Sequence, residues 1–287
     1  MITYKTYEDM ANTIRLNLWK IPQDINCVIG IPRSGMFAAL IVSELLNVKC
    51  MSIDDFVLGV NMSCGNSRSM FVRDNGTNKV LVLDDTCCGG GSMATAKVAL
   101  QHLESEYQII YGCVYLTGPT SKQFVDLYLE NIYNSENFRL YEWNVFHHGF
   151  GGMQIWDIDG LMCKNPIPHD PTNEKLYEDY IANAIPMALP TVKIAGIVTY
   201  RLEKHRDITE KWLAKHNINY GTLVMMNAKN CEERRKIATP AQYKASVYNN
   251  STNIMLFIES DDSQAREIFA LTKKPVLSYS TGNLYQI

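Results

Sequence analysis

Several features are missing from this sequence of 287 residues, and each absence excludes a class of protein. Its 27 lysines and arginines are balanced by 30 acids and form no dense basic run, which argues against a large electrostatic footprint for duplex nucleic acid. No apolar run reaches the roughly 18 to 20 residues that a membrane-spanning helix requires. The eight cysteines contain no CxxC pair, and the chain has no internal repeat or low-complexity tract.

The length and the first residues set further expectations. The chain is long enough for two ordinary domains, each with its own core. Glu8 and Asp9 follow Met1 closely, so this N-terminus lacks the basic and apolar segments of a signal peptide. We therefore expect a cytoplasmic protein with reduced, mostly buried thiols and no membrane partner. The sequence leaves the oligomeric state open, a homo-oligomer included.

The first half of the chain alternates short apolar runs with stretches of helical periodicity. Strands are predicted at 26–31, 49–57, 79–83 and 108–116, and helices at 7–19, 35–46 and 92–104. This βαβ rhythm is typical of a mainly parallel sheet with helices on both faces. It breaks within 126–146, and the glycine-rich HHGFGG that follows indicates a flexible joint.

The second half predicts the same class of fold. Strands are expected at 153–158, 193–199, 221–226, 253–258 and 275–279, with helices at 174–185, 202–216, 241–248 and 263–271. We therefore predict an α/β protein of two domains, each a mainly parallel sheet flanked by helices. The expected domains are residues 1–148 and 153–287, joined by a glycine-rich linker at 149–152.

The stretch DDTCCGGGS, residues 84–92, joins a buried apolar run to a helical stretch. Its three glycines let the backbone approach an anion closely, and Ser92 can cap the helix and donate a hydroxyl. A helix N-terminus beyond the carboxyl end of a strand offers unpaired N–H groups, so this hinge favours a bound phosphate. Asp84 and Asp85 suit the two hydroxyls of a sugar, or a Mg²⁺ ion that carries a pyrophosphate.

The hinge, with the apolar residues before it, resembles the fingerprint of the type I phosphoribosyltransferases. The resemblance implies that the ribose hydroxyls of phosphoribosyl pyrophosphate (PRPP) bind Asp84 and Asp85. It places the 5-phosphate on a loop of Cys88, Gly89, Gly90, Gly91 and Ser92. Cys88 and Gly89 depart from the residues that are usual in the family. A transferase and a domain that only senses PRPP or a nucleotide therefore both stay open.

A second motif, VIGIPRSG at 28–35, fits the same family. Its pattern predicts a strand, a tight turn and a helix. The resemblance implies a pyrophosphate-binding loop that contains Arg33, Ser34 and Gly35. An ordinary strand-to-helix turn with a solvated Arg33 is the alternative.

In the second half, MQIWDIDG places Asp157 and Asp159 after an apolar run. Two carboxylates at this spacing can aim into one site, one as nucleophile and the other as proton donor, and a capping loop is the alternative. Further polar residues follow in order near later strand ends and at a helix: Thr199, Lys244, Glu259, Asp261 and Asp262.

That order resembles the haloacid dehalogenase (HAD) superfamily of phosphohydrolases over residues 153–287, with a minimal cap. The resemblance implies that Asp157 attacks phosphorus and that Asp159 protonates the leaving oxygen. Thr199 would bond the phosphoryl oxygens, and Lys244 would neutralise charge. A Mg²⁺ ion would be held by Asp157, Asp159 and one acid among Glu259, Asp261 and Asp262, with Asp261 favoured.

Arg201 follows the threonine by two residues, as in the phosphatase domains attached to polynucleotide kinases. This resemblance implies a grip on the substrate phosphate. A surface ion pair for Arg201 and a solvated helix position for Lys244 are the alternatives.

Together the resemblances imply a bifunctional enzyme of nucleotide metabolism. The first half would transfer phosphoribose from PRPP to a base or other acceptor, and the Mg²⁺-dependent second half would remove the 5-phosphate from the product. Two alternatives stay open: a phosphatase with a sensing N-terminal domain, and a non-enzymatic ligand-binding regulator. Small phosphorylated, nucleotide-like substrates are expected, a nucleic-acid partner is left open but not favoured, and the acceptor is not identified.

Overall fold

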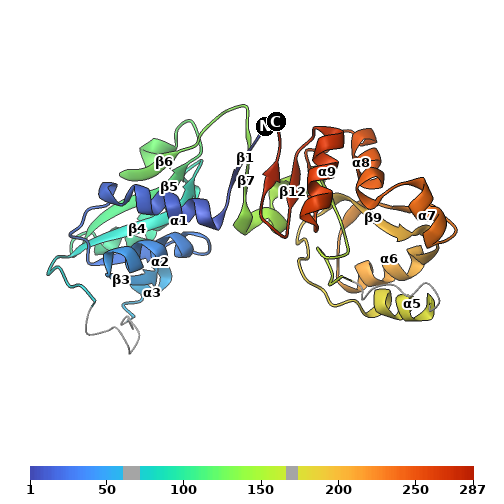
Figure 1. The fold of residues 1–287 in the computed structure, drawn as a ribbon. Coiled ribbons are helices and arrows are strands. Elements are labelled where there is room, and N and C mark those ends of the chain that lie inside the picture. Colours follow the sequence, from blue (N-terminus) through green and yellow to red (C-terminus); the bar gives the residue numbers. More distant parts are fainter. Residues whose placement is uncertain (61–71, 166–173) are drawn as a thin grey trace. The chain divides into compact units, whose positions relative to one another are not determined.

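The structure is a computed structural model that describes residues 1–60, 72–165 and 174–287. The chain divides into two compact units, shown in Figure 1. The N-terminal unit is Lys5–Asn137, and the C-terminal unit is Phe138–Ile287 together with Met1–Tyr4. Each contains a mainly parallel sheet flanked by helices, so the predicted α/β class is confirmed. In the described ranges no helix has both the length and the apolar character that crossing a membrane needs.

The boundary between the units lies earlier in the chain than the expected one. Residues 138–152 belong to the C-terminal unit, where Val145 is part of the core and the ring of Phe146 packs edge-on against Trp156 at 5.3 Å between centroids. The segment expected to be a flexible joint forms two 3₁₀ helices, Glu142–His147 and Gly149–Met153. Aromatic packing thus places these residues with the second half.

The N-terminal unit contains a five-stranded parallel sheet. In spatial order its strands are β3 (Lys49–Ser52), β2 (Cys27–Gly30), β4 (Lys79–Cys87), β5 (Gln108–Leu116) and β6 (Leu127–Asn131). The chain runs from β2 outward to β3 and then returns as β4 on the other side of β2. Such a reversal creates a crevice at the carboxyl ends of the two central strands, where open α/β sheets bind ligands.

Helices cover both faces of this sheet. On one face, α3 (Ile53–Val57) and α4 (Gly91–Leu100) share a core with β2 and β4. On the other face lie α1 (Tyr7–Leu16) and α2 (Gly35–Leu46), and α2 contacts the same two strands. Both Leu81 and Val82, which point to opposite faces, are fully buried. This explains why the strands read as continuous apolar runs.

The C-terminal unit contains a six-stranded sheet. Its order is β10 (Tyr220–Met226), β9 (Ile194–Leu202), β8 (Gln154–Trp156), β11 (Leu256–Glu259), β12 (Val276–Ser278) and β13 (Leu284–Tyr285). All pairs are parallel except β12 with β13. A separate two-stranded sheet joins β1 (Ile2–Lys5) to β7 (Phe138–Tyr141). The chain leaves β8 toward β9 and later returns beside it as β11, so the switch point lies at β8.

Helices also sandwich this second sheet. On one face, α8 (Pro240–Asn250) and α9 (Asp262–Thr272) pack on Ile155 and Phe257. On the other face, α6 (Arg206–Lys215) packs through Trp212 near Trp156 and Ile258. Outside α6 lies α5 (Glu174–Asn183), and α7 (Cys231–Ile237) precedes α8. Successive residues of β8 and β11 thus pack into the cores on opposite faces of the sheet. Polar residues lie at the ends of these strands.

Several elements differ from the sequence prediction. Strand β4 was expected to end at residue 83 and continues to Cys87, and β1, β6, β7, β13 and α7 were not predicted. Residues 53–57, expected as strand, form α3, because Ser52 Oγ accepts the N–H of Asp55 at 3.1 Å and caps a helix whose first turn carries acids. Strand β9 was expected to end at Thr199 and instead continues to Leu202. Thr199 and Arg201 therefore lie within a strand, at the point where the register between β9 and β10 shifts.

Candidate functional site

Two carboxylates and a lysine meet at the carboxyl ends of β8 and β11. Asp157 directly follows β8 and Glu259 ends β11, with 4% and 0% of each residue exposed. Lys244 from α8 places its Nζ 3.0 Å from Asp157 Oδ2 and 2.7 Å from Glu259 Oε2. The solvated position considered for Lys244 is excluded by its 3% exposure. Two buried carboxylates thus share one buried ammonium.

The electrostatics of this cluster leave one negative charge uncompensated. Burial, followed by the charge of Glu259, raises the pKa of Asp157 although Lys244 opposes the shift. Burial by itself would lower the pKa of Lys244, but the two carboxylates outweigh it and raise that pKa. Because a desolvated charge without a partner is unfavourable, the cluster favours binding a proton or a further cation.

Ser260 holds the two acids in place and was not among the predicted residues. Its Oγ donates to Asp157 Oδ2 at 3.1 Å, while Glu259 Oε1 accepts the N–H groups of Ser260 and Asp261 at 2.9 and 3.2 Å. The signal in the sequence is a hydroxyl residue directly after the acid that ends an apolar strand. Such a residue reaches the neighbouring strand end in a parallel sheet.

The other two acids after β11 have different surroundings. Asp261 caps α9, since its Oδ1 accepts Gln264 N–H at 2.9 Å. Asp262 accepts hydrogen bonds from Tyr285, Thr281 and Arg266. The Tyr285 hydroxyl is the main cause of its lowered pKa. Of the three acids considered as metal ligands here, Glu259 is the one bonded to the Asp157–Lys244 pair.

A second ion pair lies beside this cluster. Arg201 of β9 forms a two-pronged hydrogen bond to Asp159, with Nε 2.9 Å from Oδ2 and Nη2 2.6 Å from Oδ1. Burial alone would lower the pKa of Arg201, which is 1% exposed, but the Asp159 carboxylate raises it. Thr199 Oγ1 accepts the Arg201 N–H at 3.2 Å. The considered surface position of Arg201 is therefore excluded, and its guanidinium orients Asp159.

A cavity of about 420 Å³ adjoins this pair and has the size of a small-molecule site. Its lining includes Asp159, Glu174, Tyr177, Tyr200, Arg201, Lys204, His205 and Arg234. Arg234 lies over the ring of Tyr200 at 4.3 Å. Asp159 lines the cavity, whereas Asp157, two residues earlier, does not. The cations suit an anionic ligand, and the tyrosines offer apolar faces.

The N-terminal unit has its candidate site at the switch between β2 and β4. Asp84 and Asp85 lie inside β4, which continues to Cys87, and are 7% and 5% exposed. Asp84 Oδ1 accepts the Asp85 N–H at 2.9 Å. Burial first, and the charge of Asp85 second, raise the pKa of Asp84 to about 8. Such a pair retains a proton unless a cation or hydroxyl donors bind it.

The predicted loop at 31–35 lies next to Asp84. The N–H of Ile31 donates to the Leu83 carbonyl at 3.0 Å. A Cβ on Gly35 would lie 2.8 Å from that carbonyl and 3.0 Å from Asp84 Oδ1, so glycine is needed where α2 starts. Arg33 is exposed and Ser34 half-buried, and the Pro32–Arg33 peptide bond is cis. The structure thus brings this loop and the acidic pair together.

The glycine hinge at residues 84–92 leads into helix α4, whose N-terminus has no side-chain cap. Helix α4 begins at Gly91, and its N-cap is Gly90 in the left-handed conformation with φ 74°. Ser92, expected to cap the helix, is its second residue, so that expectation is wrong; the cap is Gly90, two residues earlier. Cys88, Gly89 and Ser92 are exposed. The first N–H groups of α4 therefore have no side-chain acceptor at the cap, which suits an anion.

Replacing Gly90 by alanine should destabilise the N-terminal unit by about 2 kcal/mol or more. A Cβ there would lie 2.2 Å from the Phe124 ring, and the positive φ adds strain. Gly89→Ala is the matched control, because its Cβ would meet nothing within 4 Å. Urea unfolding of both variants measures the difference, and equal effects would contradict this account of the hinge.

Replacing Asp84 by asparagine should change how stability depends on pH. In the folded protein the pKa of Asp84 is raised from 3.8 to about 8. The stabilisation that comes from its bound proton is therefore complete below pH 3.8 and is lost as the pH rises through 8. The amide side chain of the variant does not ionise. The free energy of unfolding of Asp84→Asn, relative to that of the wild type, should therefore be higher at pH 9 than at pH 5 by about 1 kcal/mol or more. Denaturant unfolding at both pH values tests this, and a constant difference would refute it.

Comparisons with known proteins concern the fold. No family model matches the sequence, and no curated protein does. The structure is similar to a purine phosphoribosyltransferase from Pyrococcus horikoshii, at 15% identity over 49% of this chain and 92% of that one, with a TM-score of 0.35. It is also similar to the xanthine-guanine-hypoxanthine phosphoribosyltransferase from Helicobacter pylori, at 13% identity over 50% of this chain and 93% of that one, with a TM-score of 0.36. A chain of the Pnkp1/Rnl/Hen1 RNA repair complex is 11% identical over 88% of this chain and 94% of that one, with a TM-score of 0.34.

Proposed function

We propose that the C-terminal unit is a Mg²⁺-dependent phosphohydrolase that forms an aspartyl-phosphate, an acyl phosphate, on Asp157. One observation carries the proposal. Asp157, Lys244 and Glu259 meet, buried, at the switch point of the sheet, where two carboxyl groups share one ammonium. Beside them Asp159 lines a cavity that also contains Arg201, Lys204 and Arg234. The proposed proton carrier and the anion-binding side chains therefore line one cavity, and the buried proposed nucleophile lies two residues before Asp159.

In the proposed first step, an oxygen of Asp157 forms a bond to phosphorus and the bond to the leaving oxygen breaks, while Asp159 gives that oxygen a proton. Water then attacks phosphorus, Asp159 takes its proton, and the bond to the Asp157 oxygen breaks. Inorganic phosphate and the free alcohol leave. A phosphate that draws Arg201 away from Asp159 would let Asp159 bind the proton that it donates. Lys244 stabilises the negative charge on Asp157 before the first step and again when the bond to phosphorus breaks.

The residues present suit a Mg²⁺ ion. Their donors are carboxylate oxygens, which this hard ion prefers, and the cluster has one negative charge too many. The expected ligands are Asp157, the carbonyl of Asp159, and either Glu259 or Asp261. When bound, the ion supplies charge neutralisation for the phosphoryl oxygens.

The test is phosphate release by the purified full-length protein from ribose 5-phosphate, nucleoside monophosphates and a generic aryl phosphate, with and without Mg²⁺. Acid quenching followed by peptide mass spectrometry should find a phosphoryl group on the peptide that contains Asp157. We expect release that requires Mg²⁺. Release from none of these esters would overturn the proposal.

For the N-terminal unit we propose PRPP binding at Asp84 and Asp85, with transfer of phosphoribose to an acceptor and release of pyrophosphate. The supporting observation is that the acidic pair, the 31–35 loop and the uncapped start of α4 all lie at the carboxyl ends of β2 and β4. The phosphohydrolase would then remove the 5-phosphate of the product. Covalent linkage of the two units would raise the effective concentration of that product.

Calorimetry with PRPP tests this second function. Asp85→Asn should weaken PRPP binding by about tenfold or more, because it removes a charged acceptor of hydroxyl hydrogen bonds. Pyrophosphate release with purine and pyrimidine acceptors then separates a transferase from a sensing domain, which would bind PRPP and release none. A wild-type protein that does not bind PRPP contradicts both.

A further inference from the structure

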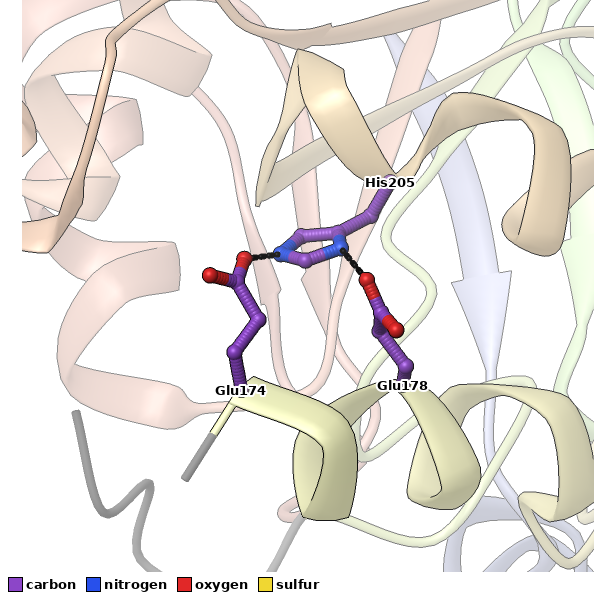
Figure 2. Close-up of side chains that lie close together, drawn as sticks. All are labelled: Glu174, Glu178 and His205. Carbon is purple, nitrogen blue, oxygen red and sulfur yellow. Dashed lines mark ion pairs between the residues drawn. The ribbon is translucent and has the colours of Figure 1, made fainter. Parts of the chain in front are cut away.

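Glu174, Glu178 and His205 form a separate cluster, shown in Figure 2, and two of them, Glu174 and His205, line the cavity. The two glutamates lie one turn apart on α5, so their side chains share a face of that helix. His205 ends the 3₁₀ helix Glu203–His205, which precedes α6. Its Nε2 lies 3.6 Å from Glu174 Oε1, and its Nδ1 lies 3.9 Å from Glu178 Oε1. One possible ligand atom from each residue lies within 4.8 Å of the others.

The histidine provides a second, independent observation. His205 is 3% exposed, and its Nδ1 has no hydrogen-bond partner within the part of the chain that the structure describes. The 3.9 Å separation from Glu178 is too long for a hydrogen bond. A buried ring nitrogen without a partner calls for a bound group, because proteins seldom leave such atoms unsatisfied.

The charges around the ring favour a cation. A metal ion binds to the lone pair of one imidazole nitrogen, and the Nδ1 of His205, unpartnered within the described residues, can supply one. Two carboxylates face this ring, and the ammonium of Lys204 already pairs with Glu174. One negative charge in the cluster remains uncompensated.

We propose that Glu174, Glu178 and His205 bind a divalent transition-metal ion, for which zinc is the best fit. One imidazole nitrogen and two carboxylate oxygens are typical ligands of zinc sites that have three protein ligands and one open position. Magnesium is a poorer fit, because it prefers oxygen ligands alone. Glu174 and His205 line the cavity, so the open position would face a ligand there. The side chains of the two glutamates are 51% and 48% exposed.

The ion would act independently of the phosphohydrolase residues. It would compete with Lys204 for Glu174, and it would add positive charge to the cavity wall. Neither effect requires Asp157, Lys244 or Glu259, so failure of this proposal and failure of the proposed function can be told apart.

The experiment is titration of the chelator-treated full-length protein with Co²⁺, a spectroscopic substitute for zinc, in excess Mg²⁺. We expect one tight site without a thiolate-to-cobalt charge-transfer band, displaced by Zn²⁺. Glu174→Gln and Glu178→Gln should each weaken binding by more than about tenfold. Asp179→Asn is the matched control, since it removes an exposed carboxylate from the same helix. Asp157→Asn should leave Co²⁺ affinity at this site unchanged.

Two further results decide the proposal. Lys204→Met should tighten Co²⁺ binding by about threefold or more, because the competing ammonium is gone. Equal affinity of the wild type and Glu178→Gln, or a band from cysteine thiolates, would overturn it and leave His205 as an ion-paired residue only. The test uses variants of the half-exposed glutamates, because replacing them does not disturb the core, whereas replacing the buried His205 would.

Discussion

Phosphate release should fall by at least about 10³-fold when Asp157 is replaced by asparagine, because the amide cannot form the covalent intermediate. The variant should fold. The raised pKa of Asp157 shows that burial and Glu259 disfavour its ionised form, and a neutral side chain of the same shape relieves that conflict. Lys244 keeps Glu259 as its partner at 2.7 Å. Steady-state phosphate release with saturating Mg²⁺ is the measurement, with the unfolding midpoint as the check on folding.

The control for this variant is Asp207→Asn, which removes an exposed carboxylate in the first turn of α6. Its phosphate release should equal that of the wild type. If Asp157→Asn retained more than about a tenth of the activity, Asp157 would not be the nucleophile.

Replacing Lys244 by methionine should lower the free energy of unfolding by about 3 to 5 kcal/mol, because Asp157 and Glu259 are then buried together without a cation. The loss should shrink toward low pH, where Asp157, whose pKa is raised by burial and by the charge of Glu259, takes up a proton in the folded state and the repulsion weakens. Denaturant unfolding at pH 5 and pH 8 measures both effects.

Lys236→Met is the matched control for Lys244. Lys236 pairs with Glu232 at 2.6 Å, but the two side chains are 73% and 78% exposed. Water screens such a pair, and its loss should cost less than about 1 kcal/mol. Similar losses for the two variants would show that the buried cluster contributes no more than a surface ion pair.

The helices and the central strands were predictable because both sheets are covered on both faces. The predicted helix at 35–46 and strand at 108–116 coincide with α2 and β5. Burial on two faces produces apolar runs that stand out from amphipathic helices. Helix α3 was missed because its few apolar residues continue the run of β3, and the cap at Ser52 that ends the strand is a single hydroxyl.

The candidate sites were predictable in kind but not in pairing. The strand-end position of Asp157 is visible in the sequence, whereas its contact with Lys244 depends on how α8 packs on the sheet. The sequence favoured Asp261 over Glu259, yet Asp261 stands where α9 begins and is used as its cap. The spacing of Glu174 and Glu178 is readable as one helix face, but its neighbour His205 comes from another element.

The small two-stranded sheet of β1 and β7 decides where the chain can be divided. Ile2 is 5% exposed in the core of the C-terminal unit, its N–H donates to the Gln286 side chain at 2.9 Å, and β1 pairs with β7. A gene fragment that starts at Phe138 would therefore encode an incomplete domain with a gap where Ile2 belongs. A circular permutant that fuses the C-terminus to Met1 and opens after Tyr4 would supply the missing strand in one piece.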